Sequence, residues 1–394
     1  MDQGAVSGAL AELEQAIGPF IRWATSNTAL AGDQSINDFV YGNPHDLAMP
    51  EYVDALRRGL EPRDPSHFAY KMNEPQATAA VARSLRERFG IAFEAEDVFM
   101  TNGNFSGLSI AMRATVEPGD EVVFVSPPWF FYEVLILAAG ARPVRVLADR
   151  KTWDLDLDAI AEAITSRTRA IIVNSPNNPT GRIYPPETLE PLAGLLGEAS
   201  ARNGRPIYVL SDEAYSRIVF DDRPFFTPVE HYAHSFMIYT YGKTHLAPGL
   251  RLGYLAVPPT MPNRDRIRGA LMLSQLLTGW AFPVAPLQHS MTELERITID
   301  VKQLQRRRDR VTSALRDQGY ELTVPEGTFY VLVRSPLEDD MAFVEMLNRR
   351  NNYVLPGKMF EMPGFFRISL TASDEMVERG IPGFAAAMKE VRRK

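Results

Sequence analysis

The sequence predicts an α/β fold in which a mostly parallel sheet is covered by helices and is followed by a smaller α+β domain. Between residues 97 and 257, short apolar runs rich in β-branched residues alternate with segments of helical periodicity. This alternation is typical of parallel sheets buried under helices on both faces. It stops after about residue 290, where a long amphipathic segment precedes isolated strand-like runs. A chain of 394 residues also exceeds the length that one hydrophobic core usually supports, so we expect two domains.

The N-terminal part is expected to be mostly helical. Residues 1–35 have a helical pattern that ends in small and polar residues, and we expect them to pack on another subunit or to cap their own domain. Residues 36–41 read as a short strand that runs into the turn Gly42-Asn43-Pro44. Helical patterns follow at residues 51–60 and 76–89, with prolines between them.

The central part supplies the strands of the main sheet, and the residues after each strand are candidate site residues. The expected strands are residues 97–101, 121–125, 143–147, 170–173, 207–210, 236–239 and 252–257. Helical patterns such as residues 158–165 and 187–203 lie between several of them. In a sheet of this kind the ligand lies beyond the carboxyl ends of the strands. Polar or aromatic residues follow these ends at Gly103-Asn104-Phe105, Pro127-Pro128-Trp129, residues 175–181, Asp212-Glu213-Ala214-Tyr215 and Gly242-Lys243.

The C-terminal part is expected to form the second, smaller domain. An amphipathic stretch at residues 292–318 leads into strand-like segments at residues 329–333 and 365–370 and a final helix at residues 377–393. We expect this part to recruit the N-terminal segment. The predicted small domain therefore comprises residues 1–48 and 291–394, and the predicted large, ligand-binding domain comprises residues 49–290.

The composition is that of a soluble globular protein and excludes several function classes. Apolar residues make up 45% and charged residues 23% of the chain, and the formal net charge of −7 argues against a nucleic-acid partner. The absence of cysteine excludes disulfides, thiolate nucleophiles and cysteine zinc sites. The N-terminus lacks the pattern of a secretory signal, and no apolar run is long enough to span a bilayer, so we expect no membrane partner and a cytoplasmic enzyme.

The stretch Tyr239 to Gly253, YTYGKTHLAPGLRLG, places a single lysine, Lys243, between glycines and an arginine, Arg251, eight positions downstream. The glycines allow a ligand to approach the backbone closely, and the arginine offers a planar fork suited to phosphate. A lysine held in this way can form a Schiff base. The Gly-Lys-Thr motif also matches the end of a nucleotide-binding loop, but Met237 stands where that loop requires a glycine. Taken alone, so short a motif is more typical of an exposed loop with a solvated lysine.

Residues at the other strand ends supply what one particular ligand needs. If these ends converge, Asp212 offers a carboxylate that would keep a ring nitrogen protonated, and Asn178 and Tyr215 offer hydrogen bonds. Trp129 offers a flat face for an aromatic ring. Residues 103–105 offer backbone amides at a helix start, where a phosphate would be held together with the downstream arginine. The ligand that these groups describe is pyridoxal phosphate (PLP), which acts as an electron sink when a lysine binds it, so the large domain is the expected PLP-binding domain.

Three motifs follow one another in order along the chain. They are Asn178-Pro179-Thr180-Gly181, then Asp212-Glu213-Ala214-Tyr215, then Lys243 followed by Pro248-Gly249-Leu250-Arg251-Leu252-Gly253. This set resembles the aspartate aminotransferase family, the fold-type I PLP enzymes of aminotransferase class I/II, and the resemblance extends from about Asp38 to the end. It implies an aminotransferase of amino acid metabolism that binds PLP, has no metal, and forms a homodimer with shared active sites.

The resemblance also implies a role for each residue around the cofactor ring. Lys243 would bind the cofactor as a Schiff base (the internal aldimine) and shuttle the proton at the α-carbon of the substrate. Asp212 would pair with the pyridine nitrogen, while Asn178 and Tyr215 would hydrogen-bond the ring oxygen. Trp129 occupies the position that stacks on the ring.

Further roles concern the phosphate and the substrate. By the same resemblance, the phosphate would be held by Gly103, Asn104, Phe105, Thr240 and Arg251, together with Tyr70 from a second subunit. Arg367, in the string Phe366-Arg367-Ile368-Ser369, would bind the substrate α-carboxylate in a bidentate manner, and Gly42 would line the substrate side. The family commonly has serines at the positions of Thr240 and Gly242, so this chain keeps one of the two hydroxyls.

The implied reaction is transamination by a ping-pong mechanism, which moves an amino group between an amino acid and a 2-oxo acid. The same site chemistry also serves lyases, decarboxylases and oxidases, because the cofactor supplies the electron sink and the protein selects the bond that breaks. A PLP-binding regulator would need a DNA-binding domain, for which the N-terminal segment is too short and too acidic. No additional cation for a dicarboxylate substrate can be placed. The aromatic residues Tyr41, Phe130, Phe131 and Tyr132 are compatible with an apolar or aromatic side chain.

Overall fold

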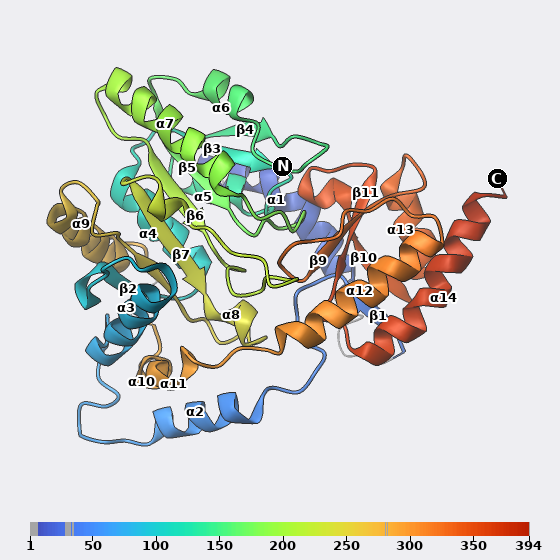
Figure 1. The fold of residues 1–394 in the computed structure, drawn as a ribbon, viewed down its shortest axis with the longest axis horizontal. Coiled ribbons are helices and arrows are strands. Elements are labelled where there is room, and N and C mark those ends of the chain that lie inside the picture. Colours follow the sequence, from blue (N-terminus) through green and yellow to red (C-terminus); the bar gives the residue numbers. More distant parts are fainter. Residues whose placement is uncertain (1–6, 28–32, 34, 280, 282, 394) are drawn as a thin grey trace.

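The computed structural model describes residues 7–27, 33, 35–279, 281 and 283–393. Within these residues the chain forms a seven-stranded sheet and a four-stranded sheet, each packed against helices. Figure 1 shows the larger sheet with its helices on the left and the smaller sheet with the C-terminal helices on the right. The expected α/β fold is confirmed.

The larger sheet is parallel except for one strand. Its strands are β2 (Val98–Thr101), β3 (Glu121–Ser126), β4 (Arg142–Leu147), β5 (Thr168–Asn174), β6 (Tyr208–Asp212), β7 (Ser235–Thr240) and β8 (Gly253–Ala256). They lie in the order β2-β8-β7-β6-β5-β3-β4, and β8 pairs antiparallel with both of its neighbours. The other pairs that involve β3 to β7 are parallel, so their carboxyl ends share one edge of the sheet.

Helices cover both faces of the larger sheet. They are α2 (Pro50–Leu60), α3 (Pro75–Phe89), α4 (Asn104–Thr115), α5 (Tyr132–Ala138), α6 (Leu157–Ala163), α7 (Pro186–Asn203), α8 (Tyr241–Thr244), α9 (Arg264–Leu277), α10 (Ala285–His289) and α11 (Met291–Leu294). Strand β7 shows how the faces are divided, because successive strand residues point to opposite sides. Phe236 and Ile238 belong to the apolar layer of α4, α5 and α9, whereas Met237 and Tyr239 belong to the layer of α2 and α3.

The smaller sheet joins residues from the two ends of the chain. Its strands are β1 (Asn37–Phe39), β9 (Tyr330–Arg334), β10 (Asn352–Pro356) and β11 (Phe365–Ser369), in the order β1-β10-β11-β9. β1 pairs parallel with β10, with Asn37 opposite Asn352, while β11 pairs antiparallel with β10 and β9. The helices beside this sheet are α12 (Val301–Asp317), α13 (Asp340–Asn348) and α14 (Asp374–Val391). The domain boundaries themselves stay a prediction.

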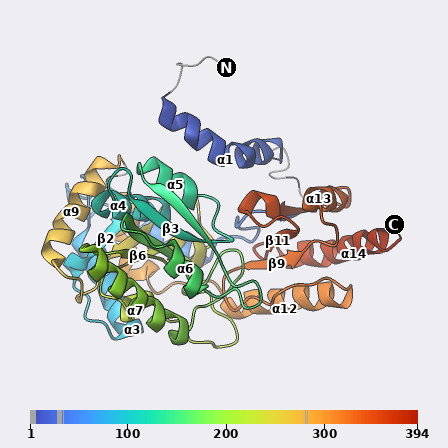
Figure 2. The same cartoon turned by 90° about the horizontal axis from the view of Figure 1, so that it is seen from above.

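The first helix, α1 (Gly8–Asn27), lies against α5 of the larger sheet. In Figure 2 it crosses above α5 and extends toward the smaller sheet. The ring of Phe20 stacks on that of Phe130, with centroids 4.1 Å apart. Helix α1 therefore packs on its own chain, against a helix of the larger sheet. Residues 1–6, 28–32 and 34 of the predicted helical segment lie outside the described residues.

Two C-terminal elements differ from the sequence prediction. The amphipathic stretch at residues 292–318 is not one helix, because the Asp300 side chain accepts hydrogen bonds from the Lys302 and Gln303 amides and so caps a new helix, α12. The amide of Ile299 donates to the carbonyl of Thr244, which holds the intervening segment against α8. Strand β10 was not expected, because five residues ending in a proline carry little strand signal.

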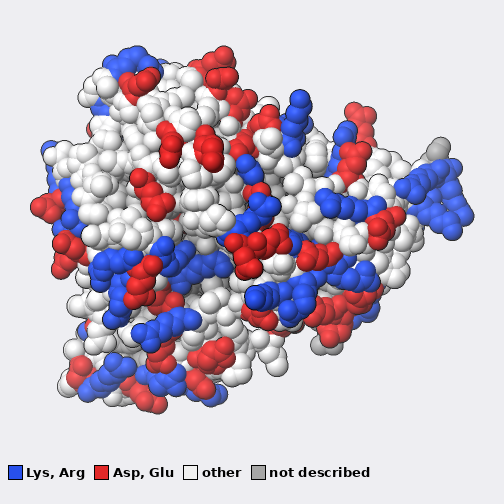
Figure 3. Space-filling view, in the orientation of Figure 1, with Lys and Arg blue, Asp and Glu red and all other residues white. Residues whose placement is uncertain are grey.

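Two further features concern the surface charge and the apolar character of the helices. On the face shown in Figure 3, acidic and basic side chains are interspersed over most of the surface, with a basic group where the chain ends. None of the described helices has the length and apolar character that crossing a membrane requires.

Candidate active site

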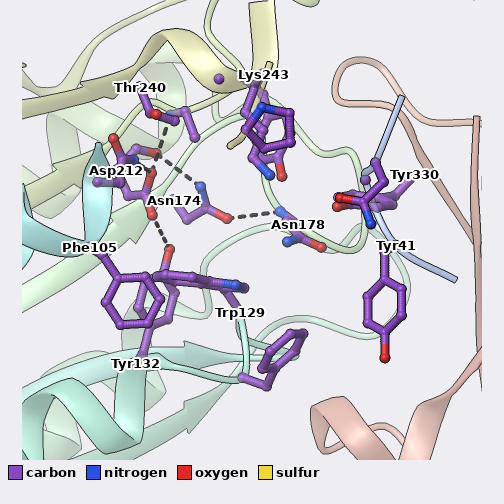
Figure 4. A pocket seen from close by; sticks show the side chains of 18 of the residues that line it. Tyr41, Phe105, Trp129, Tyr132, Asn174, Asn178, Asp212, Thr240, Lys243 and Tyr330 are labelled. Carbon is purple, nitrogen blue, oxygen red and sulfur yellow. Dashed lines mark hydrogen bonds between the residues drawn. The ribbon is translucent and has the colours of Figure 1, made fainter. Parts of the chain in front are cut away.

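A cavity of about 470 Å³ lies where the carboxyl ends of β5, β6 and β7 face the smaller sheet. Figure 4 shows its side chains turned toward one common space. Most of the predicted site residues line it: Gly42, Asn104, Phe105, Trp129, Asn178, Asp212, Tyr215, Thr240, Lys243, Arg251 and Arg367. Gly103 and Tyr70 are the predicted site residues that do not. The strand ends therefore converge, as the strand pattern predicts.

Gly103 lies directly behind the cavity wall, at the N-cap of α4. Its φ of +80° favours glycine, and a Cβ built on it would lie 2.9 Å from Nη2 of Arg251 and 3.2 Å from Oγ1 of Thr240. Arg251 donates from Nη1 to the Pro248 carbonyl at 2.7 Å, and burial lowers the pKa of its guanidinium. The helix start, the hydroxyl and the guanidinium therefore form one cradle suited to an anion.

Lys243 projects from α8, the short helix that begins where β7 ends. Its Nζ lies 5.7 Å from the ring centroid of Tyr215 and 5.6 Å from that of Phe329. The helix is anchored from behind, because the Tyr241 hydroxyl donates to the carboxylate of Glu295. These contacts hold the backbone of Lys243 while its amine faces the cavity (Figure 4).

Gly242 stands where the family that the sequence resembles commonly has a serine. A Cβ at this position would lie 3.0 Å from the Cα of Pro248, so the loop that carries Arg251 would have to shift by a few tenths of an ångström to admit a side chain. The missing hydroxyl is in keeping with how tightly this loop packs on α8.

Asp212 ends β6 and is buried, with a relative exposure of 4%. Its Oδ2 accepts a hydrogen bond from the Tyr132 hydroxyl at 2.7 Å, and its Oδ1 accepts from the amide of Ala214 at 3.2 Å and from the side-chain amide of Asn104. Burial raises the pKa of the carboxyl, although these hydrogen bonds and Lys243 oppose the change. A cationic group placed beside this carboxylate would offset the cost of its burial.

Arg367 reaches from β11 of the smaller sheet to the cavity. Its Nη1 donates to Oδ1 of Asn178 and its Nη2 donates to the carbonyl of Val40, both at 3.0 Å. Its Nε is buried and has no hydrogen-bond partner within the described part of the chain. A buried guanidinium with a donor left over is suited to bind a carboxylate.

Asn174 connects this arginine with Asp212. The side-chain oxygen of Asn174 accepts from the backbone amide of Asn178 at 2.8 Å, and its side-chain amide donates to the carbonyl of Asp212 at 2.9 Å. A continuous set of hydrogen bonds therefore runs from Arg367 through Asn178 and Asn174 to the end of β6, and most of it is drawn in Figure 4.

Tyr215 and Tyr330 form a buried pair beside Lys243. Burial raises the pKa of Tyr215, and its hydrogen bond with Tyr330 acts in the same direction. Burial alone would also raise the pKa of Tyr330, but Arg367 and Lys243 outweigh it and leave that pKa below its ordinary value. The two cations thus favour the ionised form of the Tyr330 phenol.

Gly42, in the turn after β1, faces Tyr330 and Phe329. A Cβ on it would lie 2.7 Å from the Tyr330 hydroxyl oxygen and 2.7 Å from Cε2 of Phe329. A side chain at this position would collide with both rings, so glycine is required by packing and not by turn geometry alone.

Trp129 lies on the opposite side of the cavity from Lys243 (Figure 4). Its ring meets Phe105 edge-on at 5.0 Å and Tyr132 edge-on at 5.5 Å. These contacts fix the plane of the indole and leave one face available to stack on a flat ligand.

Tyr70 lies outside this arrangement. It is 90% exposed, in the segment between α2 and α3. Within one chain, therefore, the structure does not bring it to the predicted phosphate cradle.

Among the lining residues that were not predicted as site residues, Tyr132, Asn174 and Tyr330 contact predicted ones. Asn174 is the last residue of β5, one position before the segment singled out at that strand end, so a wider window would have included it. The sequence places Tyr132 only among aromatic residues compatible with an apolar wall, and nothing in its spacing indicates the contact with Asp212. Tyr330 begins β9 of the smaller sheet, for which the strand-end rule makes no prediction.

Comparisons with known proteins agree with this geometry. The profile of the family described as aminotransferase class I and II matches residues 35–383. The aspartate/prephenate aminotransferase of Thermus thermophilus is 30% identical over 358 residues, which cover 88% of this chain and 89% of that protein. The probable aspartate/prephenate aminotransferase of Aquifex aeolicus is 28% identical over 370 residues, which cover 90% and 91% of the two chains.

Solved structures show the same similarity in three dimensions. An amino transferase from Eubacterium rectale superposes with a TM-score of 0.87 at 30% identity, covering 98% of this chain and 97% of that one. The aspartate aminotransferase of Thermotoga maritima superposes with a TM-score of 0.82 at 26% identity, covering 97% and 99%. The similarity thus extends over both sheets.

Proposed function

The chain belongs to the aminotransferase class I and II family and is a PLP-dependent transaminase, and from this premise we propose that the cavity around Lys243 is its active site. One observation carries the proposal. The cations among the described lining residues are Lys243, Arg251 and Arg367. The amine of Lys243 faces the cavity, and the neighbours of Arg251 and Arg367 suit a phosphate and a carboxylate in turn. Transamination needs these three functions and one reactive amine.

The residues present fit the cofactor. The cradle of Gly103, Thr240 and Arg251 has no room for a Cβ and presents donors to an anion, so it would hold the phosphate, with the amides of Asn104 and Phe105 at the start of α4. Asp212 is a buried carboxylate with no salt bridge among the described residues, and it would pair with the protonated pyridine nitrogen. Asn178 and Tyr215 would hydrogen-bond the ring oxygen, and Trp129 would stack on the ring.

The cofactor, when bound, supplies the electron sink for charge that develops at the α-carbon of the substrate. Lys243 carries the one amine among the described residues that line the cavity, so it is the group that removes and returns a proton at that carbon. Arg367, with its unused Nε and its Nη atoms fixed by Asn178 and Val40, holds the α-carboxylate of the amino donor and of the 2-oxo acid in turn. One site therefore serves both halves of a ping-pong cycle.

We further propose that two copies of the chain form a dimer with shared active sites. Large apolar side chains are exposed on the outer face of α9, at Met272, Leu273, Leu276 and Leu277, and in the segment that holds Phe68 and Tyr70. Asn73 and Gln275 hydrogen-bond at 3.1 Å, which ties the segment between α2 and α3 to α9. An apolar surface of this kind is typical of a subunit interface. Tyr70 of a second copy would then complete the phosphate cradle that it does not reach in its own chain.

The domain division and the cellular location are also proposals. We assign residues 1–48 and 291–394 to the smaller domain and residues 49–290 to the larger one. The pairing of β1 with β10 supports the first assignment, although α1 packs on α5 of the larger part. We propose a cytoplasmic location, which suits a chain whose full sequence has no cysteine and so needs no oxidising compartment.

Absorbance spectroscopy of the purified protein with PLP tests the site. We expect a near-visible band that a panel of L-amino acids, including the aspartate of the relatives' names, removes and that 2-oxo acids restore. Lys243→Ala should abolish the band and the amino transfer, whereas Lys151→Ala, at an exposed lysine outside the cavity, should change neither. A normal band in Lys243→Ala would overturn the assignment of this lysine.

A further inference from the structure

We propose that the outer end of the cavity is an aromatic subsite, built by Tyr41 and Phe130 with helix α1 behind them, and that the amino donor carries a large apolar or aromatic side chain. The inference rests on the proposed function, because the subsite is defined relative to Arg367 and Lys243. It names the substrate class of that same site.

The position of Tyr41 follows from Arg367. The carbonyl that accepts from Nη2 of Arg367 belongs to Val40, the residue just before Tyr41, so the tyrosine starts where a bound α-carboxylate would lie. The Tyr41 carbonyl is held in turn by the Thr371 hydroxyl at 3.2 Å. Figure 4 shows Tyr41 on the Tyr330 side of the cavity, away from Asp212. A substrate side chain that points from the α-carbon away from the cofactor therefore passes the ring of Tyr41.

Phe130 forms the other wall of the subsite, and α1 holds it in place. Phe130 lines the cavity, and the ring of Phe20 from α1 stacks on it with centroids 4.1 Å apart and planes 28° apart. Trp23 lies one turn further along α1, and its ring centroid is 6.5 Å from that of Tyr41. Three segments of the chain thus bring four aromatic rings to one end of the cavity. Aromatic walls of this kind bind apolar groups and leave charged groups without a partner.

The charges of the cavity argue against a second carboxylate on the donor. Each cation among the described lining residues already has a role, with Lys243 at the α-carbon, Arg251 at the phosphate and Arg367 at the α-carboxylate. The one basic residue of α1, Arg22, lies along its own helix, with Nη1 3.1 Å from where a Cβ of Gly18 would stand. Within one chain, a distal carboxylate would therefore lose its water among aromatic rings without gaining a cation from the described residues, which is costly.

Unreactive carboxylates test the subsite without any turnover. The PLP-loaded enzyme is titrated with propanoate, 3-phenylpropanoate and succinate, and binding is followed by calorimetry. We expect 3-phenylpropanoate to bind about 10- to 100-fold more tightly than propanoate, since this is the effect of burying an aromatic side chain, and succinate to gain nothing. Succinate binding as tightly as 3-phenylpropanoate would overturn the proposal.

Variants show whether the named rings are responsible. Phe130→Ala should weaken 3-phenylpropanoate about 10-fold and leave propanoate unchanged. Phe20→Ala should act in the same direction but less strongly, because Phe20 acts through Phe130, and Phe20→Leu should restore part of the loss. Ile21→Ala, at a 52% exposed residue of the same helix, is the control and should change neither ligand. Equal weakening of both ligands in Phe130→Ala would indicate a purely structural role and contradict the subsite.

Half-reactions separate a wrong substrate class from a wrong function. Loss of the near-visible band is measured in single turnovers with L-phenylalanine, L-leucine, L-alanine and L-aspartate. For each donor we compare the ratio of the single-turnover rate constant to Kd. We expect this ratio to be about 10-fold or more higher for L-phenylalanine and L-leucine than for L-alanine. If L-aspartate is the best donor, the substrate class is wrong while the transaminase stands. If no donor removes the band, the proposed function of this site fails, and the carboxylate titrations still decide whether the aromatic subsite exists.

Discussion

The guanidinium carbon of Arg367 lies 3.8 Å from the centroid of the Tyr330 ring, so the arginine rests on the face of the phenol. The hydroxyl of the same phenol interacts with Tyr215, the residue that faces the ring oxygen of the cofactor in our proposal. Tyr330 thus connects the carboxylate-binding arginine with the cofactor side of the cavity. Its ring and its hydroxyl have separable roles, which two substitutions can distinguish.

Replacing Tyr330 should give two different defects. Tyr330→Leu removes the cation–π contact, which is worth about 0.5–2 kcal/mol, and should raise KM for amino donors about 2- to 30-fold. Tyr330→Phe keeps the ring and should change KM little. It removes the hydrogen bond that helps to raise the pKa of Tyr215, so Tyr215 becomes a stronger donor to the ring oxygen. The pH midpoint of the cofactor absorbance should then move to lower pH. A titration curve identical to that of the wild type would show that the hydroxyl has no such role.

Gly42→Ala should damage the same arrangement by collision. The added methyl group would meet the Tyr330 hydroxyl oxygen and the Phe329 ring at 2.7 Å, and overpacking of this kind costs about 1–3 kcal/mol of stability. Because Tyr330 must move to relieve the clash, we expect KM for amino donors to rise as in Tyr330→Leu. Denaturant unfolding and steady-state kinetics measure the two effects.

Gly194→Ala is the matched control for this substitution. Gly194 lies inside α7, and a Cβ there would meet nothing within 4 Å. Alanine should stabilise that helix by about 0.5–1 kcal/mol and leave the kinetics unchanged. If both glycine variants behave alike, contact with Tyr330 is not what constrains residue 42.

The residues of the larger sheet could be predicted because a simple rule places them. Asn178, Asp212 and Lys243 each follow an apolar strand, and the carboxyl ends of parallel strands meet at one edge. Local patterns were sufficient to find those strands, so the convergence of the side chains could be expected without knowing any distance.

Residues whose placement depends on packing between elements could not be predicted in this way. Tyr132 reaches Asp212 from a helix, and Tyr330 reaches Arg367 from a different sheet, so neither contact has a sequence period. Helix α9 was missed for a related reason. Leu273 and Leu277, on its outer face, are 62% and 66% exposed, so its apolar residues do not mark a single buried side.

That exposed face of α9 leads to a prediction about assembly. Leu277→Glu places a charge on the proposed dimer surface and should shift the sedimenting species from two chains toward one chain of 44.1 kDa. Leu147→Glu, at a 53% exposed leucine of the edge strand β4, should leave the assembly unchanged. A dimer of unchanged affinity in Leu277→Glu would place the interface elsewhere.

Tyr70 links the assembly to the cofactor. If Tyr70 of a second copy donates to the phosphate, Tyr70→Phe should keep the dimer and weaken PLP binding about 10- to 100-fold, the usual effect of one hydrogen bond to a charged group. Equilibrium dialysis of PLP measures this. Wild-type affinity in Tyr70→Phe would show that the phosphate cradle is complete within one chain.

Glu213, next to Asp212, makes the stability of the fold depend on pH. Burial raises its pKa from 4.5 to about 7, although the hydroxyls of Thr227 and Ser211 both donate to its carboxyl. As the pH rises, the unfolded chain releases this proton near pH 4.5, whereas the folded chain keeps it until about pH 7. The folded state therefore binds more protons in this window, and the free energy of unfolding falls as the pH rises, by about 3 kcal/mol for this group.

Glu213→Gln should remove this dependence, because glutamine keeps an acceptor for Thr227 and Ser211 and carries no charge at any pH. Urea unfolding at pH 5 and pH 8 should show the variant gaining stability relative to wild type mainly at pH 8. Glu198→Gln, at an exposed position of α7, should change stability equally at both pH values. A Glu213→Gln variant that is equally or more destabilised at pH 8 than at pH 5 would mean that the buried carboxylate is stabilised when charged, and the sign of its pKa shift would have to be reversed.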